Sequence, residues 1–206
     1  MISLFLSLVL PLNIVISEIS WMGNNDSYTN EWIEIYNRTD YPIDLDGWQL
    51  SSRNNNLKIK LGGEIAKNSF YLLERTDDNT VLEVQADKIY KGSLSNIGEI
   101  LELFDDSGNL IDSIDCSLGW FAGDNETKQT MERKSFLVLG SDSENWQDSI
   151  QAGGTPKAKN SKYTIFEKPK EIFQKEKKSF FFPWSALITA VLSGVIILGL
   201  KKKIKK

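Results

Sequence analysis

Few side chains in this 206-residue chain are suited to the commonest catalytic chemistry. The sequence contains no histidine, which removes the Ser-His triad, the usual general base and the commonest metal ligand. The single cysteine, Cys116, has no histidine to activate its thiol and no second cysteine for an intramolecular disulfide. We therefore predict that Cys116 is a small, partly buried side chain beside a strand, and that a hydrophobic core holds the domain together.

The carboxylates are the remaining reactive groups. Asp44, Asp46 and the loop 105–109 offer oxygen ligands to Ca²⁺, but neither stretch has the twelve-residue EF-hand pattern. Asp, Asn and Gly also occupy such positions for backbone reasons, and we favour turn formation. A glycosidase-like carboxylate pair is a weaker alternative, because 25 acidic residues within 13–160 make chance pairs common. We expect no catalytic residue, no metal and no cofactor, and predict that the chain is not an enzyme.

Aromatic side chains offer a different chemistry, a stacking platform for a sugar. The aromatic residues considered for such a platform are Trp21, Tyr28, Trp32, Trp48, Trp120 and Trp146. Trp32 and Trp48 fit the interior better, because they lie in or beside apolar strand patterns. Trp120 lies in the glycine-containing loop 118–123, where an exposed apolar cluster would mark a contact surface. The candidate ligand-contact loop is therefore Trp120 and Phe121.

Short strands must position these groups. In residues 31–37, polar and aromatic side chains alternate with Ile33 and Ile35, and Pro42 and Gly47 then form a corner before a second strand at 48–50. Similar patterns predict strands at 14–19, 57–61, 70–73, 100–104 and 110–114, and a short edge strand at 130–133. Periodicity does not decide residues 81–90. With no convincing amphipathic helix, the pattern predicts an all-β antiparallel sandwich over residues 13–160.

Both ends of the chain differ from this middle part. Residues 1–12 form an uncharged apolar run that resembles a secretory signal, with a buried first strand as the alternative. Residues 161–179 form a Lys-rich stalk. Residues 180–200 are 21 uncharged residues, long enough as a helix to span about 30 Å of hydrocarbon. The basic tail 201–206 follows, and we predict one C-terminal transmembrane helix with the β domain outside and the tail in the cytoplasm.

The charges divide unevenly between these parts. Residues 13–160 carry 13 Lys and Arg against 25 Asp and Glu, a net charge of −12, whereas residues 161–206 carry +8. An acidic domain repels phosphate backbones, so nucleic acid is an unfavoured partner. The lysines of 201–206 fit the cytoplasmic flank of a membrane span instead.

Several blocks, in order along the chain, resemble the lamin-tail domain family. The matching segments are 15–19 (VISEI), 31–37 (EWIEIYN), 44–48 (DLDGW), 93–103 (SLSNIGEILEL), 108–113 (GNLIDS), 132–133 (ER), Trp146 and 155–160 (TPKAKN). The resemblance implies an immunoglobulin-like antiparallel β-sandwich without a shared catalytic set. Bacterial members are found on secreted or membrane-attached proteins and are usually regarded as binding or targeting modules. The chain departs from the family pattern at Lys157, where the family often has glycine.

These observations together predict a single-pass membrane protein that displays a non-catalytic binding, adhesion or envelope structural module outside the cell. The expected partners are the membrane and an extracellular protein or polysaccharide. Two alternatives stay open: a surface protein whose C-terminal helix is removed during sorting, and an accessory subunit of an extracellular hydrolase. No LPxTG-like motif precedes residues 180–200, which counts against the familiar sortase route.

Overall fold

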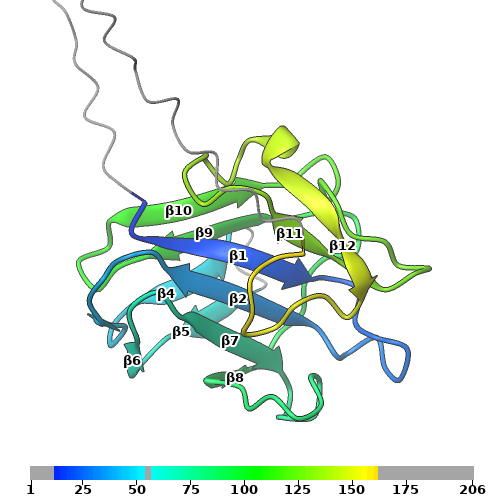
Figure 1. The fold of residues 1–206 in the computed structure, drawn as a ribbon, viewed down its shortest axis with the longest axis horizontal. Helices are drawn as coiled ribbons and strands as arrows, with labels where there is room; N and C mark the ends of the chain where they lie inside the picture. The colour runs from blue at the N-terminus through cyan, green and yellow to red at the C-terminus, as the bar shows by residue number, and fades with distance from the viewer. Residues whose placement is uncertain (1–11, 54–56, 162–206) are drawn as a thin grey trace, which may run out of the picture. The chain divides into compact units, whose positions relative to one another are not determined.

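The computed structural model describes residues 12–53 and 57–161. These residues form two main β-sheets and a small two-stranded one (Figure 1). The strands are β1 (Ile14–Ser20), β2 (Trp32–Asn37), β3 (Ile43–Asp44), β4 (Gln49–Ser52), β5 (Lys58–Lys60), β6 (Glu64–Ile65), β7 (Phe70–Arg75), β8 (Lys88–Tyr90), β9 (Ile100–Phe104), β10 (Leu110–Asp115), β11 (Gln129–Arg133) and β12 (Trp146–Ala152). One turn of 3-10 helix, η1 (Ser143–Asn145), precedes β12.

The larger sheet has six strands in the order β12-β11-β1-β2-β7-β8, and the second has four in the order β10-β9-β4-β5. Neighbouring strands are antiparallel except β7 and β8, which run parallel. The twelve residues between them, 76–87, supply the long connection that a parallel pair needs. The prediction of an all-β sandwich is confirmed, with this one parallel pairing as a departure from a wholly antiparallel arrangement.

The core lies between the two main sheets. Ile33 and Ile35 of β2 point into it, and both are fully buried. Leu101 and Leu103 of β9 meet them from the opposite sheet. Trp48 packs against the same core, whereas Trp32 lies on the other face of β2 and is buried there.

Sequence patterns misjudged the edge of the larger sheet. The predicted edge strand at 130–133 is β11, which pairs with β1 on one side and β12 on the other, so it is an interior strand. The polar sequence of β12, WQDSIQA, gave no alternation of apolar residues from which to predict it. Residues 81–90, left undecided by periodicity, contribute only the short strand β8.

The outer face of the larger sheet is covered by the segment 153–161, which we call the strap. It leaves the end of β12 and crosses in front of β1 and β2 (Figure 1). Residues 1–11 and 162–206, which hold most of the predicted signal and all of the predicted membrane span, lie outside the described residues. No helix within the described residues is long and apolar enough to cross a membrane.

Candidate functional site

One end of the sandwich gathers four loops, 21–31, 76–87, 91–99 and 116–128, which we call the loop end. Register places them together, since Ser20 at the end of β1 pairs with Trp32 at the start of β2. In the other sheet, the end of β10 pairs with the start of β9. Contacts also join the loops directly: the Asn24 side-chain amide donates to the carbonyl oxygen of Thr80 at 3.3 Å.

The predicted contact residues, Trp120 and Phe121, lie at this loop end. Trp120 stacks on Trp21 with ring centroids 5.9 Å apart and planes 7° from parallel. Its indole N–H donates to the Ser95 carbonyl oxygen at 2.7 Å, and the Trp21 indole donates to Ala122 at 3.0 Å. Both Trp120 and Phe121 are partly buried and pack against the core. The stack therefore holds loop 21–31 against loop 116–128. A role of Trp120 and Phe121 in ligand contact stays a prediction.

Sequence reasoning missed three exposed apolar side chains at this end, Leu82, Ile97 and Leu118, and considered a fourth, Tyr28, only as part of an aromatic platform. Leu118 is fully exposed and Ile97 is 84% exposed. Tyr28 and Leu82, on the neighbouring loops, also extend into solvent. Single large apolar residues in polar loops form no periodic pattern, so only the fold reveals that these four share one end. Exposed apolar side chains that share one end of a domain are typical of a contact site.

Gly98 lets the loops that carry Ile97 and Leu118 pack backbone to backbone. Its φ of 105° lies in the region that favours glycine, and an added Cβ would lie 2.0 Å from the Cys116 carbonyl oxygen. We expect Gly98→Ala to lower the free energy of unfolding by about 2–4 kcal/mol. Gly108→Ala is the matched control, because its φ is also positive but its Cβ would meet nothing within 4 Å; it should cost about 1 kcal/mol. Urea denaturation of both variants tests this, and equal costs would contradict it.

The aspartates considered for Ca²⁺ form hydrogen bonds within turns. Asp44 accepts from the backbone N–H of Asp46 at 2.9 Å, and Asp46 accepts from Gly63 at 2.8 Å. Asp105 accepts from the side-chain amide and the backbone of Asn109, and these bonds lower the pKa of its carboxyl group. In the described part of the chain, no three His, Cys, Asp or Glu side chains are grouped as metal ligands.

Cys116 follows β10 directly and is fully buried. Burial raises the pKa of its thiol to about 12, so the nucleophilic thiolate is disfavoured at neutral pH.

The most unusual electrostatic feature lies beneath the strap. Glu18 of β1 is the register partner of Glu34 on β2 and of Glu132 on β11, and all three side chains are fully buried. Burial raises the pKa of Glu18 to about 8, and nearby Glu132 adds repulsion. Burial also raises the pKa of Glu34 well above its usual value, with Glu18 contributing. Three carboxyl groups side by side are tolerated because the strap supplies hydrogen-bond donors and because the raised pKa values of Glu18 and Glu34 favour their neutral forms.

The strap places its donors on each glutamate in turn. Thr155 donates its N–H to Glu18 at 3.0 Å and its hydroxyl to Glu132 at 3.1 Å. The Lys157 N–H donates to Glu34 at 2.5 Å. Lys157, the departure from the family's glycine, has a φ of 55°, in the left-handed region that glycine favours. The enclosed carboxylates therefore hold the strap and are not presented to a substrate.

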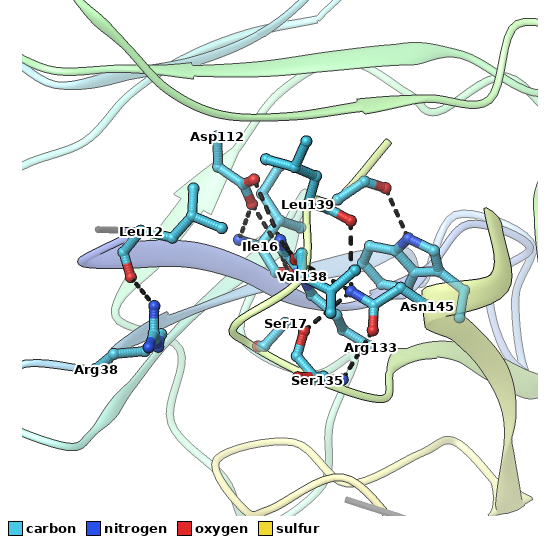
Figure 2. A network of polar contacts seen from close by, with 12 residues as sticks. Leu12, Ile16, Ser17, Arg38, Asp112, Arg133, Ser135, Val138, Leu139 and Asn145 are labelled. Atoms are coloured by element: carbon cyan, nitrogen blue, oxygen red, sulfur yellow. Dashed lines mark hydrogen bonds and ion pairs between the residues drawn. The ribbon is translucent and has the colours of Figure 1, made fainter. Parts of the chain in front are cut away.

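A second buried network ties the two sheets together at the end of β11 that lies away from the loop end (Figure 2). Arg133 donates to Asp112 of β10 at 2.6 Å, and both side chains are almost wholly buried. The same guanidinium donates to the carbonyl oxygens of Ile16 and Val138, at 3.1 and 2.6 Å. Asp112 in turn accepts from the Ile16 N–H at 2.8 Å. The pair thus satisfies the backbone of β1 beside its register shift, where β11 no longer pairs with it.

Two facing sheets with glycine-rich turns and an enclosed core define an all-β, immunoglobulin-like sandwich. The family model for the Lamin Tail Domain matches residues 11–117, just over half of the chain. The chain therefore belongs to the lamin tail domain family, as the sequence blocks had indicated. No curated protein matches it.

Proposed function

We propose that this chain is a non-catalytic binding module, held at the outer surface of a membrane by residues 180–200 and contacting its partner through the loop end. The observation that carries the proposal is the exposure of Tyr28, Leu82, Ile97 and Leu118 on loops at one end of a rigid sandwich. Sandwiches commonly bind through loops that a packed scaffold positions. An extracellular protein or polysaccharide in the cell envelope is the partner class that fits this placement.

Protease treatment of intact cells tests whether the domain lies outside the cell. With an antibody against residues 13–160, we expect the domain to be lost from intact cells while a small membrane fragment carrying the basic tail 201–206 stays protected. The physical reason is that the apolar run 180–200 crosses the bilayer and the lysines remain on the cytoplasmic side. A domain that resists protease until the cells are lysed would overturn this orientation.

Retention on isolated cell envelopes tests the contact surface. We compare full-length wild type with Leu118→Ser/Ile97→Ser, using envelopes from cells that lack the protein, and expect retention to fall about tenfold, because apolar contact area is lost. The matched control is Leu137→Ser/Leu139→Ser, since these exposed leucines lie on the loop after β11, at the opposite end of that strand. Equal retention of all three proteins would exclude the loop end as the contact surface.

A further inference from the structure

A groove lies between the edge strands of the two main sheets, β5 and β8, and we call this boundary between the sheets the seam. β5 is the last strand of the four-stranded sheet and β8 is the last strand of the six-stranded sheet. The groove between them has a volume of about 370 Å³ and is lined by residues 58–60 and 88–91. Its lining shares no residue with the four exposed side chains of the loop end.

Four lysines, Lys58, Lys60, Lys88 and Lys91, line this groove. None of them forms an ion pair or a side-chain hydrogen bond with another residue in the ranges 12–53 and 57–161. By contrast, Arg53, Arg75, Arg133 and Lys157 each pair with a carboxylate. Four uncompensated ammonium groups around one groove, on a domain of net charge −12, create a local site for an anionic partner.

The backbone of the same seam favours an extended polypeptide over other anions. β5 pairs with β4 and β8 with β7, so the outward edge of each strand has no strand partner within the described residues. Free edges present alternating N–H and C=O groups that a peptide strand can complete. Ile59 and Tyr90 are buried beneath the groove, and Ile89 is 39% exposed, which gives an added strand apolar contacts as well.

We infer that this groove binds an extended acidic segment of a partner protein, which adds a strand along the seam while its carboxylates pair with the four lysines. A polysaccharide or a nucleic acid could use the ammonium groups but has no peptide backbone to complete the free edges. The inference goes beyond the proposed function, because it assigns a second surface and the chemistry of its partner.

The test measures binding of a fluorescent dodecapeptide of alternating Glu and Val to the full-length protein in detergent micelles. We expect saturable binding that weakens with added salt. Lys58→Gln/Lys88→Gln should weaken it about tenfold, since one ammonium is lost from each side of the groove. Lys67→Gln/Lys159→Gln makes the same charge change at exposed sites outside the groove and should change it less than twofold. A peptide N-methylated at alternate residues should bind at least tenfold more weakly, because it cannot donate to the strand edge.

Several outcomes would overturn the inference. The groove would be a site for anions in general if another ligand bound as tightly as the unmodified peptide or more tightly. The ligands to compare are the N-methylated peptide, a sulfated polysaccharide and single-stranded DNA. Absence of saturable peptide binding, or equal effects of the two lysine pairs, would remove the groove as the site. A third result combines two observations: the Lys58→Gln/Lys88→Gln variant self-associates, and the wild type binds no peptide. The lysines would then serve only to prevent the edge strands from pairing with another copy of the chain. Leu118→Ser/Ile97→Ser should leave peptide binding unchanged, so failure here is distinguishable from failure of the proposed function.

Discussion

Replacement of Arg133 by methionine should lower the free energy of unfolding by about 3–5 kcal/mol, the usual cost of removing one member of a buried ion pair. The change leaves Asp112 buried without its cation and leaves the carbonyl oxygens of Ile16 and Val138 without the guanidinium donor. The two sheets lose the ion pair that joins them at that end of the sandwich, because Asp112 belongs to one sheet and Arg133 to the other. Urea denaturation followed by tryptophan fluorescence measures the loss.

Arg53→Met is the matched control for this prediction. Arg53 also pairs with a carboxylate, that of Glu102, but its side chain is 60% exposed. Exposed pairs contribute about 0–1 kcal/mol, so the control should be nearly neutral. The double variant Arg133→Met/Asp112→Leu should recover part of the loss, because it removes both charges, yet it leaves the Ile16 N–H without its acceptor. Equal costs for Arg133→Met and Arg53→Met would show that the buried network does not stabilise the fold.

Glu18 and Glu34, beneath the strap, predict stability that falls as pH rises from about 4.5 to about 8. Over that range Glu18 is ionised in the unfolded chain and protonated in the folded one, because its folded pKa is raised to about 8. The folded state therefore binds more protons, and each such group lowers the free energy of unfolding by up to about 1.4 kcal/mol per pH unit. Glu34 acts with the same sign, as does Glu31, whose pKa burial raises to about 7.

Glu18→Gln isolates the contribution of that carboxyl group. The amide is a neutral substitute for the protonated acid, so we expect the free energy of unfolding of the variant, relative to wild type, to rise by about 3 kcal/mol between pH 5 and pH 8. Glu64→Gln, which makes the same substitution at an exposed position on β6, is the control. Denaturant titrations at pH 5, 6.5 and 8 measure both. Wild-type stability that increases with pH, with no change in the Glu18→Gln difference, would show that Glu18 is ionised when folded.

The sequence predicted those elements whose side chains alternate locally. Ile33 and Ile35 identified β2, and the Gly-containing hairpin 105–109 identified the pair β9 and β10, because both signals lie within a few residues. β12 was missed because its residues are mostly polar, and this omission made β11 look like an edge. The family resemblance supplied the topology class that periodicity alone does not fix.

The buried carboxylates could not be predicted in the same way. Glu18 contacts Thr155, which lies 137 residues further along the chain, and no local pattern reports such a partner. A glutamate within a strand is ordinarily expected to face water. Leu118 and Ile97 posed the same difficulty at the loop end, since only the fold places their separate loops in contact. The loop that holds Trp120 and Phe121 was found from composition, but their partial burial and the stack on Trp21 depend on tertiary packing.

The strap also determines how the domain would bear mechanical load. Its last described residue, Ser161, donates to Glu132 of β11, and Asn160 donates to carbonyl oxygens of Ser17 and Arg133 on two neighbouring strands. The Ile150 N–H of the edge strand β12 also donates to the Ser161 hydroxyl, at 3.2 Å. Tension applied to the chain beyond Ser161 is therefore shared by the edge strand β12 and the interior strands β11 and β1. An edge strand can be peeled away one hydrogen bond at a time, whereas bonds spread over central strands must break together. A domain that is pulled from its C-terminal side thus bears the load on interior strands as well as on its edge strand.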